Sequence, residues 1–183
     1  MYEKTGFDRF QQRRFAHQEL LISDEEELQE ITSELKTGKP YQQILGHTEF
    51  YGKKFFVDEN VLIPRPETEE LVELAKIEIQ NLKSKIQNLK LLDIGTGSGI
   101  IPITLKNHFP KAEISAIDIS EKALEIAKKN AEFHQANIQF IQQDYLNTKL
   151  EENYDIIISN PPYIGIEENI EIDRKSTRLN SSH

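Results

Sequence analysis

The chain has 183 residues, of which 29% are charged, and its 22 basic and 31 acidic side chains give a net charge of -9. This length predicts one domain or slightly more, and the acidic balance argues against duplex DNA as the main partner, because nucleic-acid binders usually present a basic surface to the phosphates. The absence of cysteine excludes disulfides, thiolate nucleophiles and cysteine-based zinc sites. No apolar run reaches the roughly 18 residues of a membrane helix, and the first residues lack the apolar stretch of a secretory signal, so a cytoplasmic protein is expected.

The first part of the chain is predicted to be helical. Residues 1–22 are expected to form one helical segment, with three phenylalanines as core contacts: Phe7, Phe10 and Phe15. Ser23 then begins a capping box, because its side chain and that of Glu26 can each accept a hydrogen bond from a free N–H group at the start of a second helix. Gly38 followed by Pro40 is predicted to end that helix.

A hairpin is predicted next. The segment Glu49–Val57 changes from helical spacing to a β pattern, with Gly52 in the turn. Pro64 and Pro66 stiffen the backbone after it, and Pro66 suits the first position of a helix. The apolar positions of that helix recur with helical spacing: Leu71, Ala75, Ile79, Leu82 and Ile86.

From Leu89 the pattern alternates short apolar runs with helices, which indicates β-α-β units around a parallel sheet. Ser120 is predicted to cap one of these helices. The expected fold class is therefore α/β, preceded by the helical segments and the hairpin. Strands are predicted at residues 89–94, 113–117, 138–141 and 155–159, and helices at residues 98–108 and 120–135.

A glycine-rich loop follows the first predicted strand. Three of the eight glycines of the chain lie in Gly95-Thr96-Gly97-Ser98-Gly99, directly before a helix. Glycine lets the backbone approach a ligand closely, and the start of the helix presents free N–H groups. An ordinary tight turn is the alternative. The spacing G-x-G-x-G, with Ile100 where a dinucleotide fingerprint has its third glycine, argues against hydride transfer.

Acidic and aromatic residues end the next two predicted strands. Asp118 can accept hydrogen bonds from both ribose hydroxyls of an adenosine, and the alternative of capping the following helix is already covered by Ser120. Asp144 can accept from the exocyclic amine of an adenine, and Tyr145 can flank the ring. The alternative for Asp144 is a plain turn residue.

The segment Asn160-Pro161-Pro162-Tyr163 directly follows the fourth predicted strand. The two prolines hold the backbone rigid, so that the Asn160 side chain and the Pro161 carbonyl can form a fixed pair of acceptors for a planar NH₂ group. Tyr163 offers a face for stacking. Asn-Pro also occurs in plain turns, but its place at the carboxyl end of a parallel strand, where open sheets bind ligands, favours a site.

Other polar residues do not form a recognisable site. The histidines are scattered, without an i, i+4 pair, so no metal site is expected: His17, His47, His108, His134 and His183. The charges of the helix after Ser120 are interpreted as a solvated face: Glu121, Lys122, Glu125, Lys128, Lys129 and Glu132.

The motifs resemble those of a known enzyme class. The glycine loop, Asp118, Asp144 and the segment Asn160–Tyr163 look like the motifs of S-adenosylmethionine-dependent amino methyltransferases with a Rossmann-like fold. A more specific resemblance, to the peptide chain release factor N5-glutamine methyltransferases, spans about residues 7–172. Three earlier segments carry it, namely Tyr41–Gly46, Phe50–Gly52 and Val61–Glu69, with Ile63-Pro64-Arg65-Pro66-Glu67-Thr68-Glu69 as the most discriminating part.

The resemblance implies a function and a domain organisation. It implies methyl transfer from S-adenosylmethionine to the side-chain amide nitrogen (N5) of a glutamine in a peptide chain release factor. The enzyme would be a cytoplasmic monomer of translation termination that binds neither nucleic acid directly nor a membrane. The domains would be a partial helical domain at residues 1–46, a hairpin linker at 47–63 and the first four strands of a methyltransferase domain, with an incomplete parallel sheet, at 64–173.

The resemblance also assigns roles to residues. Gly95, Thr96, Gly97, Ser98 and Gly99 would wrap the methionine and ribose part of the cofactor, Asp118 would hold the ribose hydroxyls, and Asp144 and Tyr145 would flank the adenine. Asn160 would bridge the cofactor and substrate sites. Asn160, Pro161, Pro162 and Tyr163 would grip the glutamine side chain, with Asn160, Pro161 and Tyr163 as the catalytic residues.

Two alternatives remain open. The first is an N6-adenine or N4-cytosine nucleic-acid methyltransferase, which shares the logic of the Asn160–Tyr163 segment, although the acidity of the chain and the Ile63–Glu69 string argue against it. The second is an inactive truncated fragment, because the sheet of the family continues with three more strands. Residues 174–183 are abruptly basic and are interpreted as a non-native tail, without which the net charge is -12.

Overall fold

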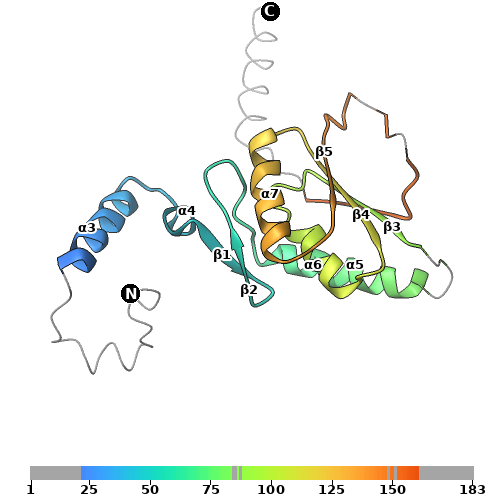
Figure 1. Ribbon diagram of the computed structural model, residues 1–183, viewed down its shortest axis with the longest axis horizontal. Helices are drawn as coiled ribbons and strands as arrows, with labels where there is room; N and C mark the ends of the chain where they lie inside the picture. The colour runs from blue at the N-terminus through green and yellow to red at the C-terminus, as the bar shows by residue number, and fades with distance from the viewer. Residues whose placement is uncertain (1–21, 84–85, 87, 148, 151, 161–183) are drawn as a thin grey trace, which may run out of the picture. The chain divides into compact units, whose positions relative to one another are not determined.

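The computed structural model describes residues 22–83, 86, 88–147, 149–150 and 152–160 (Figure 1). The predicted helix at residues 1–22, apart from its last residue, and everything from Pro161 onward, including the basic tail, lie outside the described residues. The chain divides into two compact units, residues 1–47 and residues 48–183. No described helix combines the length and the apolar character that crossing a membrane requires.

The first unit contains helices α3 (Ile22–Lys36) and α4 (Tyr41–Leu45). The predicted start of α3 after Ser23 is wrong, because the helix already includes Ile22 and Ser23. Its end is confirmed: the Gly38 N–H donates to the Leu35 carbonyl at 3.1 Å, and Gly38 has a φ of 87°. The short α4 is not predicted, because five residues are too few for a helical period to show.

Strands β1 (His47–Phe50) and β2 (Lys53–Phe56) form the predicted hairpin, with Gly52 in its turn. Both turn residues have a positive φ, 53° at Tyr51 and 65° at Gly52. Such a turn matches the right-handed twist of the two strands, and this match makes it the favoured two-residue connection.

Helix α5 (Glu67–Lys83) starts directly after Pro66, where the Arg65 and Pro66 carbonyls accept hydrogen bonds from the N–H groups of Thr68 and Glu69 at 3.0 and 2.9 Å. The predicted apolar stripe of this helix faces the core. Its members are buried or packed against the buried cluster: Leu71, Ala75, Ile79 and Leu82. Ile86 packs against the same cluster, but the prediction that the helix continues through it is wrong, because α5 ends at Lys83.

The main sheet has four strands, β3 (Lys90–Ile94), β4 (Glu113–Asp118), β5 (Gln139–Gln142) and β6 (Ile156–Ser159). All pairs are parallel, and the order across the sheet is β5-β4-β3-β6. This confirms the predicted α/β class, and each strand starts and ends within one residue of its prediction.

Helices α6 (Ile100–His108) and α7 (Glu121–Phe133) connect β3 to β4 and β4 to β5. Helix α6 contacts both α5 and α7 (Figure 1). Because the chain moves from β3 through β4 to β5 and then returns to the other side of β3, the strand order reverses at β3 and β6. In sheets of this kind ligands bind outside the carboxyl ends of the strands at such a reversal.

Candidate functional site

The sheet register brings the predicted site segments to one edge. Ile94, the last residue of β3, pairs with Ser159 at the end of β6 and with Ile117 near the end of β4. The glycine loop and Asn160 therefore leave the sheet from two neighbouring strand ends. Asp118 pairs with Gln142 one strand further along. The structure thus gathers these residues at the strand reversal, and their roles toward a ligand stay predictions.

The glycine loop has three residues with positive φ, 72° at Gly95, 54° at Gly97 and 76° at Gly99. The Gly95 and Thr96 N–H groups both donate to the Ile117 carbonyl, at 2.9 and 3.0 Å, which fastens the loop to the end of β4. A Cβ atom added at Gly95 or Gly97 would meet no described atom within 4 Å. At Gly99 it would lie 3.1 Å from the Cβ of Ala127 on α7. The first two glycines therefore face open space, and the third permits helix packing.

This difference predicts unequal effects of the same substitution. Gly99→Ala should lower the free energy of unfolding by about 3 kcal/mol, because it combines left-handed strain with a steric conflict against α7. The matched control Gly97→Ala adds the strain alone and should cost about 1 kcal/mol. Urea denaturation of both variants measures the two values, and equal losses would contradict the packing role of Gly99.

The Asp118 carboxylate is shared between the loop and the next helix. Its Oδ2 accepts from the Gly97 N–H at 2.8 Å, and its Oδ1 accepts from the Ser120 N–H at 3.0 Å. The Ser120 hydroxyl accepts from the Ala123 N–H at 3.2 Å, which confirms the predicted cap. The sequence analysis assigned the capping of α7 to Ser120 alone. In the structure Asp118 also accepts a hydrogen bond from the backbone at the start of this helix. Each carboxylate oxygen retains a second lone pair for a ligand hydroxyl.

Asp144 lies in a turn, as its alternative interpretation in the sequence analysis predicted. Its Oδ1 accepts from the Leu146 N–H at 3.0 Å, and its Oδ2 accepts from the Asn147 side-chain amide at 2.7 Å. It also lines, with Gln142, a cleft of about 530 Å³ beside β5. The neighbouring Tyr145 is 41% exposed. Tyr145 is therefore exposed to solvent. A contact between Asp144 and an adenine amine would have to use the lone pairs of its carboxylate oxygens that these two hydrogen bonds leave free.

Asn160 is the last described residue, directly after β6. It is half-buried, and its Nδ2 donates to the Thr68 hydroxyl at 3.2 Å. The preceding Ser159 hydroxyl donates to the Ile94 carbonyl at 3.0 Å. Pro161, Pro162 and Tyr163 lie outside the described residues, so that the acceptor pair of Asn160 and Pro161 stays a prediction.

Asp93, two residues before the glycine loop, is a buried carboxylate to which the sequence analysis assigned no role. It is 2% exposed, and neither its carboxylate oxygens nor the Thr96 hydroxyl have a hydrogen-bond partner among the described residues. Burial, together with the negative charge of Asp118, raises its pKa from 3.8 to about 7, although the neighbouring Thr96 side chain acts in the opposite direction. The available signal was an aspartate inside the otherwise apolar strand before the glycine loop. A buried polar group of this kind, at the ligand edge of a sheet, favours a ligand with hydrogen-bond donors.

The pKa of Asp93 predicts a pH dependence of stability. Because the pKa is higher in the folded state than the ordinary 3.8, the folded state holds the proton more tightly. Relative to pH 4 and below, the free energy of unfolding should therefore fall as the pH rises to about 7, by about 1.4 kcal/mol per pH unit. Asp93→Asn cannot ionise, so the free energy of unfolding of the protein minus that of this variant should decrease steadily over that range. A constant difference in urea titrations from pH 4 to 8 would contradict the prediction.

Asn130 is a second residue that the sequence analysis missed. It is fully buried on α7, between Ala127 and Ala131 of the predicted apolar stripe. Its Oδ1 accepts from the Phe56 N–H at 2.7 Å, and its Nδ2 donates to the Phe56 and Ser98 carbonyls at 2.9 and 2.8 Å. One amide therefore ties the hairpin strand β2 to the glycine loop. The signal was a polar residue on a helix face that is otherwise apolar.

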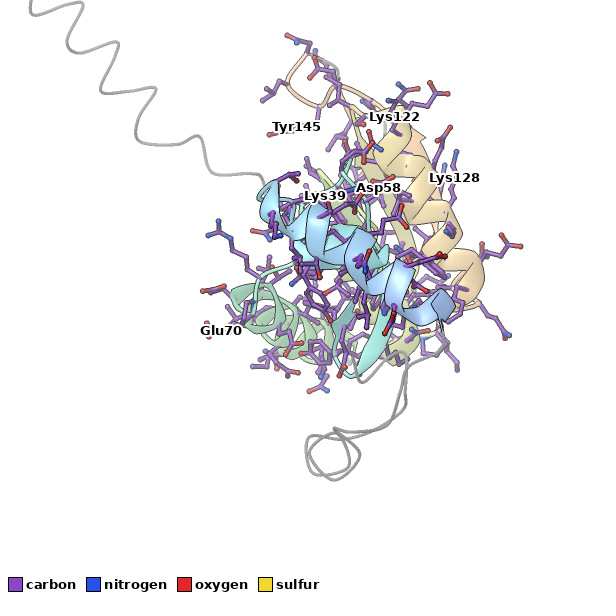
Figure 2. All side chains as sticks on the ribbon, turned by 90° about the vertical axis from the view of Figure 1, so that its left-hand side faces the viewer. Lys39, Asp58, Glu70, Lys122, Lys128 and Tyr145 are labelled. Carbon is purple, nitrogen blue, oxygen red and sulfur yellow. The ribbon has the colours of Figure 1, made fainter. Side chains whose placement is uncertain are left out.

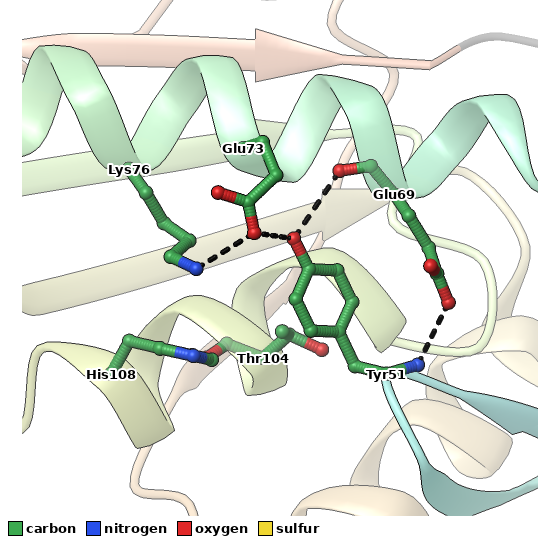
Figure 3. A network of polar contacts seen from close by, with 6 residues as sticks. All are labelled: Tyr51, Glu69, Glu73, Lys76, Thr104 and His108. Carbon is green, nitrogen blue, oxygen red and sulfur yellow. Dashed lines mark hydrogen bonds and ion pairs between the residues drawn. The ribbon is translucent and has the colours of Figure 1, made fainter.

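A polar network joins the hairpin turn to α5 (Figure 3). The Tyr51 N–H donates to Oε1 of Glu69 at 2.9 Å, and the Tyr51 hydroxyl donates to the Glu73 carboxylate. Lys76 pairs with the same carboxylate at 2.8 Å. Burial and the hydrogen bond to Glu73 raise the pKa of Tyr51. Two segments of the specific resemblance, Phe50–Gly52 and Ile63–Glu69, are therefore bonded to each other.

The histidines and the charged residues of α7 were predicted to lie outside the site, and His17 and His183 fall outside the described residues. His108 and His134 each bond a backbone carbonyl at 2.8 Å, and within the described ranges no three His, Asp or Glu side chains are placed to hold a metal ion. The charged face of α7 is exposed as predicted, with Lys122 and Lys128 on its outer side (Figure 2).

Comparison with known proteins gives consistent matches. A family model described as "Methyltransferase small domain" matches residues 73–174. A "Release factor glutamine methyltransferase" from Flavobacterium psychrophilum is 52% identical over 146 residues, which are 79% of this chain and 50% of that protein. One with the same name from Lactococcus lactis is 49% identical over 146 residues, 80% of this chain and 52% of that protein. The chain thus spans about half the length of the curated relatives it matches.

Among solved structures, the plantazolicin methyltransferase BpumL in complex with SAH is 29% identical, with a TM-score of 0.43. The match covers 51% of this chain and 35% of that chain.

Proposed function

Because the chain belongs to the methyltransferase small domain family, we propose that it transfers a methyl group from S-adenosylmethionine to the side-chain amide nitrogen of a glutamine in a peptide chain release factor. The choice of substrate is supported by the names of its relatives, at 52% and 49% identity. We further propose that the protein is a cytoplasmic monomer. The domain boundaries and the non-native tail that were expected from the sequence are part of the same proposal. Its net charge of -9 supports a protein substrate over a nucleic acid.

The observation that carries the proposal is the pairing of Ile94 with Ser159. It sets the glycine loop, which suits a cofactor, beside Asn160, which suits an amide substrate. A methyl transfer needs both partners held close and in line, and such positioning supplies much of the rate acceleration.

The residues present fit S-adenosylmethionine. Gly95 and Gly97 leave open space along the loop, and the unpartnered oxygens of Asp93 and Thr96 suit a ligand with several N–H and O–H donors. The Gly95–Gly99 loop would hold the methionine and ribose part and Asp118 the ribose hydroxyls, while Asp144 and Tyr145 would flank the adenine. When bound, the cofactor supplies an electrophilic methyl group on a sulfonium.

The chain's own part in the reaction concerns the amide. A glutamine nitrogen is a poor nucleophile because its lone pair is delocalised into the carbonyl. Asn160 Oδ1 and the Pro161 carbonyl would accept the two N–H bonds, aim the nitrogen at the methyl group and favour the positive charge that develops on it. Tyr163 would stack on the amide.

A methylation assay tests the proposal. Two proteins are compared. The first is the 183-residue chain, and the second is an extended chimera, in which the parts of the F. psychrophilum relative that lie outside the aligned residues are added to this chain. Each is incubated with S-adenosylmethionine that carries a labelled methyl group. Each protein receives either a release factor or DNA, and mass spectrometry locates the label. Label on a release-factor glutamine supports the proposal, whereas label on DNA supports a nucleic-acid amino methyltransferase. Label from the chimera alone identifies this chain as an inactive fragment, and no label from either protein contradicts the proposal.

A further inference from the structure

We propose that Thr68 is a positioning residue that holds the Asn160 side chain in place and partners its NH₂ end, which leaves the Asn160 oxygen available to a substrate NH₂ group. The inference rests on the proposed function of Asn160 as a substrate ligand. It concerns a residue of α5 that lies 92 positions before Asn160 in the chain and meets it only in the folded protein.

The contact involves one specific end of the amide. Asn160 Nδ2 donates to Oγ1 of Thr68 at 3.2 Å, and Thr68 is 5% exposed. Burial of the hydroxyl limits competition from water, so that the threonine is an effective partner for the NH₂ end. The NH₂ end of the amide is thereby occupied within the protein.

The orientation of this amide decides what it can recognise. Oδ1 and Nδ2 lie on opposite sides of the same carbon, so that fixing Nδ2 at Thr68 turns Oδ1 away from it. In this orientation the oxygen can accept from a substrate N–H. In the flipped orientation the Asn160 NH₂ group would face the substrate NH₂ group, and two donors cannot bond.

Thr68 itself is held firmly. Its N–H donates to the Arg65 carbonyl at 3.0 Å in the first turn of α5. The next residue, Glu69, accepts from the Tyr51 N–H of the hairpin turn at 2.9 Å (Figure 3). These hydrogen bonds hold the backbone that carries the Thr68 hydroxyl.

The arrangement of Thr68 and Asn160 suits one class of substrate group. A group with two N–H donors, such as a primary amide, suits an acceptor held in this way. Thr68 would not touch the substrate, and its effect would pass through Asn160 to the methyl-transfer step and leave cofactor binding unchanged.

Three variants of the extended chimera test the inference. Thr68→Val keeps the shape and removes the hydroxyl, Thr68→Ser keeps the hydroxyl, and Thr104→Val makes the same change at another buried threonine. Thr68→Val should lower kcat for release-factor methylation about 10- to 100-fold, as expected for a lost hydrogen bond to a reacting-site group. Its Kd for S-adenosylmethionine and its Tm should match those of Thr104→Val, and Thr68→Ser should restore most of kcat.

The outcomes separate this inference from the proposed function. If the unmodified chimera leaves the release factor unmethylated, the proposed function fails and the inference fails with it. If the chimera is active and Thr68→Val retains its kcat, the inference alone is overturned. Equal impairment of Thr68→Val and Thr68→Ser, or a loss of kcat that only follows weaker cofactor binding, also overturns it.

Discussion

Asn160→Ala in the extended chimera is expected to lower the rate of methyl transfer about 10³-fold, the effect of removing a preorganised polar group from the reacting centre. The substitution removes one of the two acceptors that would hold the glutamine amide. It leaves the glycine loop and its bond to Asp118 in place, since the Gly97 N–H contact does not involve Asn160. Single-turnover assays on a release factor measure the rate.

Two further measurements sharpen this prediction. Calorimetric titration with S-adenosylmethionine should show that Asn160→Ala retains most of the cofactor affinity. Asn137→Ala, the same change at an exposed asparagine, should leave both the rate and the affinity unchanged. Near-normal turnover of Asn160→Ala would contradict the role assigned to this residue.

Asn130→Asp is expected to lower the free energy of unfolding by about 3–5 kcal/mol at pH 7, the cost of an uncompensated buried charge. The variant is isosteric, but it replaces the NH₂ group by an oxygen. The Phe56 and Ser98 carbonyls would then face a carboxylate instead of a donor. Urea denaturation measures the loss.

The pH dependence of this variant identifies the cause. Burial raises the pKa of an aspartate at this position, so that protonation at low pH restores one donor. The deficit should therefore shrink as the pH falls from 7 to 4. Asn137→Asp, the matched change on the surface, should stay within about 0.5 kcal/mol of the parent protein. A similar cost at both positions would refute the bridging role of Asn130.

Local sequence signals predicted most of the fold of the second unit. The four strands of the sheet are short apolar runs that alternate with helices, and this pattern fixes both their number among the described residues and their approximate bounds. Ser120 was predicted as a cap because a cap depends on residues within one helical turn. The same locality explains why the hairpin turn at Gly52 was found.

Contacts between distant segments were not predictable in the same way. Asn130 meets Phe56 across 74 residues, and Thr68 meets Asn160 across 92. No local period encodes such partners, since they depend on sheet register and helix packing. Asp93 shows a related limit, because its residue type favours the surface whereas the structure leaves it 2% exposed.

Asp144 shows that one side chain can suit both a turn and a ligand contact. Asp144 was expected to contact an adenine, and the structure places its carboxylate in a turn with Leu146 and Asn147. A short polar side chain at the end of a strand satisfies nearby N–H groups first. Asp118 follows the same rule with Ser120, yet it also bonds the glycine loop. The two aspartates therefore differ in the backbone N–H groups that lie near them, although the residue type is the same.

The single amide that serves both Phe56 and Ser98 also bears on local dynamics. An excursion that detaches β2 from α7 breaks the hydrogen bonds of Asn130 to Phe56 and loosens the side chain that anchors the loop. Conversely, a ligand that rigidifies the loop makes such excursions rarer, because both segments share one anchor. The Phe56 amide proton, outside the glycine loop, would then exchange with solvent more slowly whenever the loop is occupied. Hydrogen exchange at a hairpin backbone amide would therefore report on the occupancy of the loop.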